Sequence, residues 1–407
     1  MINLSNEMIN SITSQYGDAV YIFNKDEFEK NYRELESTFR QEYSNYHICY
    51  SYKTNYTPAI CKCVKDLGGY AEVVSDMEYR LALELGYQPQ KIVFNGPIKG
   101  RYLEKHLLSG GINNIDRIEE ARYICEISEK NPHVGIKTGI RVNFDVDAGY
   151  TSRFGIDINK LGQIMELLKK HNVIVNGLHC HMSRARGIEP WKLRAKTMLD
   201  LIKSHDLKDI EYISLGSGMY GKMDPELKVQ FPIDAPDYKE YAEGVIRQFA
   251  EFYKEKNKKP ILFTEPGTTI VSKYVDFLGK IIGIKNIREN EFVLLNCSFH
   301  NLGETCQMKN LPIKIYHSGE ETVNIEKAKF VGYTCLEQDI VYRDYTGEIA
   351  NGDYVLFGNV GGYSLVDKPP FIMPDYPMIS IDKNKKIKVI KQRESFEDIF
   401  STFLFEE

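Results

Sequence analysis

Short apolar runs alternate with amphipathic stretches through the first two-thirds of the chain. Eight of these runs have the length and composition of buried strands; they lie at about residues 47–52, 71–75, 91–94, 112–115, 135–142, 173–180, 211–215 and 260–264. Between them, apolar residues recur at helical spacing, most clearly in Met77–Leu85, Ile118–Ser128, Lys160–His171 and Trp191–Ser204. Strands separated by helices pair in parallel through right-handed crossovers. Eight strands over about 220 residues predict a (β/α)8 TIM barrel, and a doubly wound sheet stays open as the alternative.

The pattern changes after about Thr269, where strand-like runs follow one another across Gly, Asn and Asp turns without helices between them. These runs are Val275–Ile284, Phe292–Leu295, Ala328–Thr334, Tyr354–Phe357 and Lys386–Lys391. They predict an all-β domain, which Ala19–Phe23 joins as a further strand, and Glu397–Phe405 predicts a terminal helix. We therefore expect an N-terminal segment over 1–24 that gives a strand to the β domain, a barrel over 25–268 and the β domain over 269–407.

Composition narrows the class of protein. The 407 residues are 43% hydrophobic and 27% charged, as in a globular protein of two domains. A net charge of -5 and the lack of a Lys/Arg block disfavour a nucleic-acid partner. No apolar run approaches the roughly 18–20 residues of a membrane span, and Met1–Glu7 does not resemble a signal peptide. The eight scattered cysteines lack the paired spacing of a zinc site, so we expect reduced, mostly buried thiols in a cytoplasmic protein.

Polar and glycine residues follow the predicted strands at the end where a barrel carries its active site. They are Lys53 after the first strand, Arg141 after the fifth, His179 and His181 after the sixth, Gly216-Ser217-Gly218 after the seventh and Glu265-Pro266-Gly267-Thr268 after the eighth. Each alone has an ordinary explanation, such as a surface lysine, a turn or a hydrogen-bonded core histidine. Five such features at one pole favour a functional site.

The residue types at this pole suit one cofactor. A lysine with apolar neighbours can form a Schiff base, and a glycine loop can bring backbone N–H groups against a phosphate. A flat histidine ring can stack on a heterocycle, and a buried carboxylate can keep a ring nitrogen protonated. Together they describe a pyridoxal phosphate site. His179 and His181 lack the further ligands of a metal site, so no metal is expected.

Nine motifs in order carry a family resemblance: YSYKTN, AEVVSDMEYRLALELG, IVFNGPIK, RVNFDVD…RFGI, GLHCHMS, LGSGMYG, EPGT, CLEQD and GGYS. Over about residues 18–380 the chain resembles the fold type III (alanine-racemase-like) pyridoxal phosphate enzymes, specifically the diaminopimelate/ornithine decarboxylase group. The resemblance implies that Lys53 forms the Schiff base, that His181 stacks on the cofactor ring and that Glu265 pairs with the pyridine nitrogen. It places the phosphate contacts at Gly216, Ser217, Gly218, the backbone around Gly267 and the hydroxyl of Tyr363. We also expect cofactor contacts at Arg141 and Thr268, which follow the fifth and eighth strands.

The family also has a Cys-x-x-x-Asp element, matched here by Cys335 and Asp339. In the family this element reaches into the partner's active site in a head-to-tail homodimer, and the cysteine protonates the carbanion left after CO2 departs. The resemblance therefore implies a homodimer and makes Cys335 catalytic together with Lys53 and His181.

Three departures stand out from the family pattern: the first two concern the substrate, and the third concerns a serine contact to the phosphate. Leu336 stands where the diaminopimelate enzymes carry an acidic residue that binds the distal ammonium, and Thr268 stands where they carry an arginine. An unpaired ammonium against leucine costs several kcal/mol, so we expect a substrate other than ornithine, lysine or meso-diaminopimelate. Met182-Ser183-Arg184 replaces the usual Ile/Val-Gly-Ser. Arg184, with Arg186, could receive an acidic or extended substrate, with Leu336 and Asp339 as further contacts; a solvated loop is the other interpretation of the two arginines.

The leading hypothesis is a pyridoxal-phosphate-dependent decarboxylase of an amino acid or a derivative. A racemase on the same fold is an alternative, although racemases commonly hold the ring nitrogen with arginine rather than with a residue such as Glu265. A catalytically silent regulatory paralogue is a second alternative, which the presence of Lys53, His181, Glu265 and Cys335 disfavours.

Overall fold

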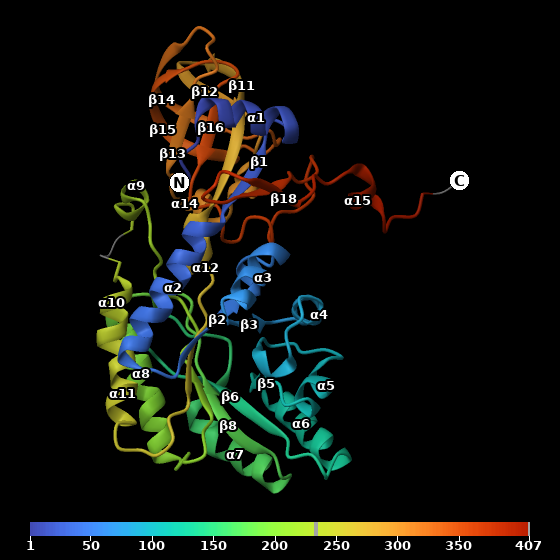
Figure 1. The fold of residues 1–407 in the computed structure, drawn as a ribbon, viewed down its shortest axis with the longest axis vertical. Coiled ribbons are helices and arrows are strands. Elements are labelled where there is room, and N and C mark those ends of the chain that lie inside the picture. Colours follow the sequence, from blue (N-terminus) through green and yellow to red (C-terminus); the bar gives the residue numbers. More distant parts are fainter. Residues whose placement is uncertain (232–234, 406–407) are drawn as a thin grey trace. The chain divides into compact units, whose positions relative to one another are not determined.

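The computed structural model describes residues 1–231 and 235–405, which divide into two compact units. The first, here called the barrel unit, comprises residues 31–220 and 235–269. The second, here called the sheet unit, comprises residues 1–30, 221–231 and 270–405. Each unit has its own sheet and its own core (Figure 1).

Eight parallel strands close into a barrel in the first unit. In chain order they are β2 (Tyr46–Ser51), β3 (Tyr70–Val73), β4 (Ile92–Phe94), β5 (Ile112–Ile115), β6 (Lys137–Asn143), β8 (Ile174–His179), β9 (Tyr212–Ser214) and β10 (Ile261–Thr264). Pairing of β5 with β6 and of β10 with β2 completes the ring, and the two-residue β7 (Ile156–Asp157) extends from β6. The TIM barrel and its eight strands are confirmed, and the doubly wound alternative is excluded by the closure of the sheet.

Helices lie outside these strands (Figure 1), as expected for right-handed crossovers. They are α2 (Lys25–Glu42), α3 (Pro58–Asp66), α4 (Asp76–Glu84), α5 (Leu103–Leu108), α6 (Ile118–Lys130), α7 (Leu161–Lys170), α8 (Ile188–Ser204), α10 (Tyr238–Tyr241) and α11 (Arg247–Phe252), with a π-helical turn at Ala242–Ile246 and 3-10 turns at Pro89–Lys91 and Ile158–Lys160. Helix α7 buries the predicted face of Leu161, Ile164 and Leu168. Among the described residues, no helix has the length and apolar character to cross a membrane.

A buried tyrosine packs against two glycine-containing strands of the barrel. Tyr212, on β9, is buried and donates its hydroxyl to the carbonyl oxygen of Asn113 and to Oδ1 of Asn114, both at 2.9 Å. Gly139 and Gly177, on the neighbouring strands β6 and β8, leave room for its ring: a Cβ at either position would overlap Tyr212. The two glycines are therefore required by packing.

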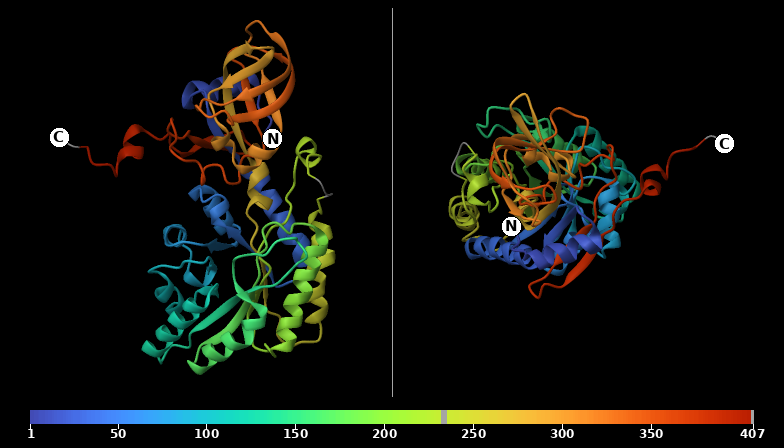
Figure 2. Two further views of the ribbon diagram at one scale, coloured as in Figure 1. Left: turned by 180° about the vertical axis from the view of Figure 1, so that it is seen from behind. Right: turned by 90° about the horizontal axis from the view of Figure 1, so that it is seen from above.

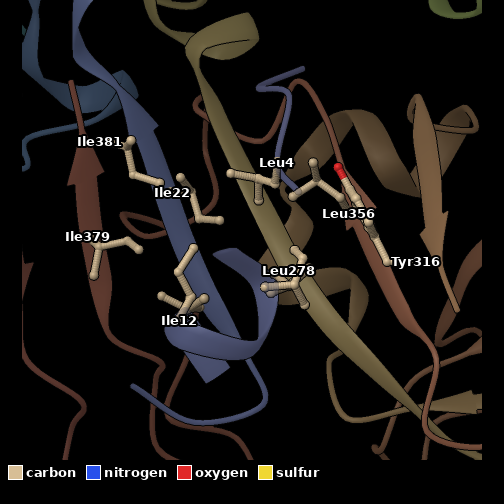
Figure 3. Close-up of a cluster of buried hydrophobic side chains, with 10 residues drawn as sticks. Leu4, Ile12, Ile22, Leu278, Tyr316, Leu356, Ile379 and Ile381 are labelled. Atoms are coloured by element: carbon tan, nitrogen blue, oxygen red, sulfur yellow. The ribbon is translucent and has the colours of Figure 1, made fainter. Parts of the chain in front are cut away.

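Nine strands form the sheet of the second unit. They are β1 (Val20–Asn24), β11 (Val275–Ile287), β12 (Asn290–Leu295), β13 (Ile313–Tyr316), β14 (Val323–Val331), β15 (Ile340–Ile349), β16 (Tyr354–Phe357), β17 (Met378–Ile381) and β18 (Ile387–Lys391), and the strands from β11 to β16 curl into a compact sheet (Figure 2). Strand β1, in the N-terminal segment, pairs with β11 and β17 of this sheet. The core of this unit includes Ile12 from α1 (Asn6–Tyr16), Leu4 just before that helix, and Ile22, Leu278 and Ile379 from strands β1, β11 and β17 (Figure 3).

The second half contains more elements than the sequence pattern predicts. Short helices α9 (Pro225–Lys228), α13 (Phe299–Leu302) and α14 (Glu304–Met308) occur, and β13, β15 and β17 were not predicted. The terminal helix is shorter than predicted: α15 spans Phe396–Phe400. The expected helix as far as Phe405 is wrong, because Phe396, Phe403 and Phe405 remain exposed and give a longer helix no buried face to stabilise it.

We expect Gly177→Ala to lower the midpoint of thermal unfolding, since overpacking a filled core costs about 1–3 kcal/mol. The matched control is Gly162→Ala in α7, where a Cβ would meet nothing nearer than His205 at 3.8 Å. This control should be neutral or stabilising, because glycine in a helix is less favourable than alanine by about 0.5–1 kcal/mol. Calorimetry that found the two variants equally stable would contradict the packing role of Gly177.

Candidate active site

The barrel gathers most of the predicted site residues at the carboxyl ends of its strands. Lys53 follows β2, Arg141 lies near the end of β6, His181 follows β8, Gly216–Gly218 follow β9, and Glu265, Gly267 and Thr268 follow β10. All of them belong to the barrel unit. The other predicted residues, Cys335, Leu336, Asp339 and Tyr363, belong to the sheet unit.

Lys53 is held by a buried carboxylate that the sequence analysis missed. It lies in the 3-10 turn Tyr52–Thr54, and its Nζ donates to Oε2 of Glu72 at 2.7 Å and to Oγ of Ser51 at 2.8 Å. Glu72, in the middle of β3, is 1% exposed and also accepts hydrogen bonds from Ser51 and Asn95. Its signal in the sequence is an acidic residue inside the apolar run YAEVV. This ion pair fixes the direction of the amine.

Glu265 is a buried, ionised carboxylate with two partners from neighbouring strands. Its Oε2 accepts from Nε2 of His179 at 3.0 Å, and its Oε1 accepts from Oγ of Ser214 at 2.7 Å. Burial acts to raise the pKa of Glu265, but the nearby His179, which hydrogen-bonds to it, and Lys53 outweigh burial and lower the pKa below its usual value. The carboxylate can therefore hold a positive charge on a ligand ring. The other ring nitrogen of His179, Nδ1, is buried and has no hydrogen-bond partner among the described residues.

His181 presents a neutral ring. Its Nδ1 accepts the backbone N–H of Ser217 at 3.1 Å. Burial, reinforced by Lys53 and Arg141, lowers the pKa of His181 well below its usual value. The guanidinium of Arg141 pairs with Asp116 at 3.1 Å and donates to the carbonyl oxygen of His181 at 3.4 Å. Arg141 thus holds the backbone of the segment that carries the histidine.

Gly216 and Gly218 are required by the shape of the loop after β9. Their φ angles are +59° and +95°, in the left-handed region that favours glycine. A Cβ at Gly216 would lie 2.5 Å from the carbonyl oxygen of Cys180, and one at Gly218 would lie 2.6 Å from that of Met182. Gly267 is equally constrained, because a Cβ there would collide with the side chain of Thr54. The loops can thus bring backbone N–H groups close to a bound anion.

The predicted residues of the sheet unit lie on two loops. Cys335 and Leu336 follow β14, and Cys335 is exposed whereas the other seven cysteines are buried, as expected for most of them. Asp339 is 2% exposed and accepts hydrogen bonds from the hydroxyl and N–H of Thr334 and from the N–H of Phe299. These bonds hold the loop that carries Cys335, a role that the sequence analysis did not assign to Asp339. Tyr363 has a φ of +53° on the other loop, after Gly361-Gly362.

The barrel residues fit pyridoxal phosphate. The amine of Lys53 suits the cofactor aldehyde, and the neutral ring of His181 suits the ring face. The ionised carboxylate of Glu265 suits the ring nitrogen, and the glycine-containing loops suit the phosphate. Among the described residues, no group of three or more His, Cys, Asp and Glu side chains could hold a metal ion.

Comparisons with known proteins agree with this geometry. Residues 26–272 match the family described as "Pyridoxal-dependent decarboxylase, pyridoxal binding domain", and residues 197–361 match "Pyridoxal-dependent decarboxylase, C-terminal sheet domain". The chain is 24% identical to the diaminopimelate decarboxylase of Aquifex aeolicus, covering 96% of this chain and 93% of that protein. It is 23% identical to the L-glutamyl-[BtrI acyl-carrier protein] decarboxylase of Niallia circulans, covering 99% and 97%.

Solved structures share the fold. The diaminopimelate decarboxylase of M. jannaschii superposes with a TM-score of 0.82 at 24% identity, over 97% of this chain and 94% of that chain. The lysine decarboxylase of Selenomonas ruminantium gives a TM-score of 0.76 at 17% identity, over 95% and 97%. With the family match over more than half of its length, the chain belongs to the pyridoxal-dependent decarboxylases of fold type III, carboxy-lyases of the diaminopimelate decarboxylase type whose cofactor is pyridoxal phosphate.

Proposed function

We propose that this decarboxylase acts on an amino acid whose distal end is acidic or extended. The observation that carries the proposal is Leu336, which follows Cys335 where an ammonium-binding carboxylate would be needed for a diamino acid. Leucine offers a distal ammonium no hydrogen-bond acceptor, so that burying the ammonium against it is unfavourable. Thr268 similarly provides no positive charge after Gly267.

Two arginines at the rim of the barrel favour an anionic substrate group. Arg184 and Arg186 follow β8, and their guanidinium carbons lie 5.8 Å from the ring centres of Tyr150 and Tyr220. Neither forms an ion pair with a carboxylate of the described residues. Both charges are therefore available to a carboxylate or phosphate on the substrate. One relative, the L-glutamyl-[BtrI acyl-carrier protein] decarboxylase, is named for an extended, carrier-bound substrate, which supports the proposal of an extended substrate.

The barrel residues would hold the cofactor and orient the reaction. Bound pyridoxal phosphate supplies an electron sink for the carbanion that the loss of CO2 leaves behind. Lys53 would bind the cofactor aldehyde through Nζ, which Glu72 orients at 2.7 Å. Glu265 would keep the ring nitrogen protonated, and neutral His181 would cover the ring face. The phosphate would be held by Gly216, Ser217, Gly218, Gly267 and Thr268, with Arg141 fixing the backbone at His181. The family resemblance adds Tyr363 as a further proposed phosphate contact.

We further propose that two copies of the chain form a homodimer in which Cys335 serves the partner's site. Its thiol is exposed, as a proton donor to a substrate carbanion must be. Asp339 holds the Cys335 loop through the hydrogen bonds from Thr334 and Phe299, so the thiol position is fixed before substrate binds.

The second candidate is meso-diaminopimelate itself, which the names of most of the similar relatives favour. A panel of CO2-release assays separates the two candidates. We expect meso-diaminopimelate, lysine and ornithine each to give a kcat/KM below about 10⁴ M⁻¹s⁻¹, and at least one acidic, N-acylated or carrier-bound amino acid to exceed it. Turnover of any of the three diamino acids above this value would overturn the proposal.

Leu336→Glu should convert the specificity towards diamino acids. A carboxylate there supplies the missing partner for a distal ammonium, and we expect kcat/KM for meso-diaminopimelate or ornithine to rise about tenfold or more, the equivalent of roughly 1.4 kcal/mol. Leu336→Met is the matched control and should leave the preference unchanged. If Leu336→Glu brings no gain on any diamino acid, Leu336 does not select the substrate.

Complementation tests the shared active site. Lys53→Ala and Cys335→Ala should each lose nearly all activity alone, whereas co-expression should restore about a quarter of the wild-type activity, since half of randomly formed dimers carry one intact site of two. Lys62→Ala, at an exposed lysine paired with Asp66, is the control and should be fully active alone. A co-expressed mixture that stays inactive would show that Cys335 does not act on the partner's site.

Glu265→Gln should lower kcat by about 10²–10³-fold while the protein still binds its cofactor, because the amide keeps the hydrogen-bonding shape but lacks the charge. Glu211→Gln is the matched control: Glu211 precedes β9 at the opposite end of the barrel, pairs with Lys137 at 2.6 Å and should be dispensable for turnover. Equal kcat values for wild type and Glu265→Gln, measured on the best substrate of the panel, would remove Glu265 from the mechanism.

A further inference from the structure

A buried arginine lies behind the loop after β9. Arg194, on α8, has an exposed fraction of 0%. Its Nη1 donates to the carbonyl oxygens of Leu215 at 2.8 Å and Ser217 at 3.0 Å, and its Nη2 donates to that of Met182 at 3.0 Å. One side chain therefore ties together the segments that follow β8 and β9.

The charge of Arg194 has no directly paired counter-ion among the residues that the structure describes. No carboxylate of the described residues forms an ion pair with it, and its Nε is buried without a hydrogen-bond partner. Its other close neighbour is the ring of Trp191, whose centre lies 4.2 Å from the guanidinium carbon. Burial, the largest cause, lowers the pKa of Arg194 from its usual value. An uncompensated buried cation is unfavourable, and an anion bound nearby would offset the penalty.

The hydrogen bonds of Arg194 also orient two backbone N–H groups. In a trans peptide the N–H points away from the carbonyl. Because the carbonyls of Met182 and Ser217 face Arg194, the N–H groups of Ser183 and Gly218 face the opposite side. Neither has an acceptor among the described residues. The two peptides are close, since a Cβ on Gly218 would lie 2.6 Å from the carbonyl oxygen of Met182.

We propose that Arg194 is a positioning residue for the phosphate of the cofactor: it fixes the peptides whose N–H groups face the phosphate and supplies the buried positive charge behind them. Hydrogen bonds from a cation to the carbonyls polarise the peptides and strengthen their N–H donors. The inference rests on the proposed phosphate loop at Gly216–Gly218. It adds a residue from outside that loop, which the motif LGSGMYG does not contain.

The test compares pyridoxal phosphate with pyridoxal, which lacks the phosphate. The full-length chain, freed of cofactor by dialysis, is titrated with each ligand and binding is followed by absorbance. In Arg194→Met we expect the affinity for pyridoxal phosphate to fall about 10–100-fold, the range for hydrogen bonds to charged groups, and that for pyridoxal to change less than about threefold. Lys196→Met is the control, since Lys196 lies on the same helix but is exposed and pairs with Asp200; both affinities should stay at wild-type values.

If Arg194 had only a structural role, Arg194→Met would lower the affinity for both ligands by the same factor. That result would overturn the proposal, and so would an unchanged affinity for both ligands. If Arg194→Met does not fold, Arg194→Lys keeps the charge with a single nitrogen and should lose affinity for pyridoxal phosphate selectively, by a smaller factor. An equal loss for both ligands in Arg194→Lys overturns the proposal as well.

Gly218→Ala separates this inference from the loop assignment on which it rests. If Gly218→Ala lowers the preference for pyridoxal phosphate over pyridoxal and Arg194→Met does not, the loop binds phosphate and the role of Arg194 is wrong. If neither variant changes the preference, the phosphate loop itself is wrongly assigned.

Discussion

Two carboxylates buried inside the barrel, Glu72 and Glu265, determine how the polar residues around them are arranged. Their exposed fractions are 1% and 2%, so each must be compensated by the protein rather than by water. Glu72 is compensated by Lys53, Ser51 and Asn95, and Glu265 by His179 and Ser214. The hydrogen bonds that compensate the two buried carboxylates therefore also hold Lys53 and His179 in place.

The compensation extends through the barrel as a chain of hydrogen bonds. Asn95, which donates to Glu72, accepts from Asn114, and Asn114 accepts in turn from Tyr212. Tyr212 fits because Gly139 and Gly177 leave space for it. The position of the Lys53 amine is therefore connected by direct contacts to the packing of the barrel interior. Arg194 is a buried charge that this network does not reach, which is why an external anion is the natural partner for it.

The sequence predicted the ends of the strands better than the partners of the residues found there. Lys53, His181 and Glu265 could be placed at one pole because parallel strands of a barrel end on the same side. Glu72 and Arg194 were missed because their partners come from other strands or loops, and no periodicity reports such contacts. The sheet unit was predicted less completely: β15 has mixed polarity and few fully buried positions, and α15 is shorter than predicted because its aromatic face is exposed. The length of α15 depends on which of its side chains are buried, and burial is a property of the folded chain rather than of the local sequence.

The contrast between strand ends and loops explains how the substrate preference of such an enzyme can change while its cofactor chemistry is kept. The residues proposed to hold the cofactor lie at strand ends, where the hydrogen-bonded sheet fixes the backbone and where Gly216 and Gly218 tolerate no side chain. Leu336, Arg184 and Arg186 lie on loops, whose side chains can be exchanged without disturbing a strand or a buried charge. A diamino-acid enzyme and an acidic-substrate enzyme can thus share the barrel, differing at positions where a substitution costs little stability. The position next to the exposed thiol of Cys335 is such a place: under the proposed function, exchanging one loop side chain there changes the group offered to the distal end of the substrate and leaves the buried Asp339 contacts of the loop intact.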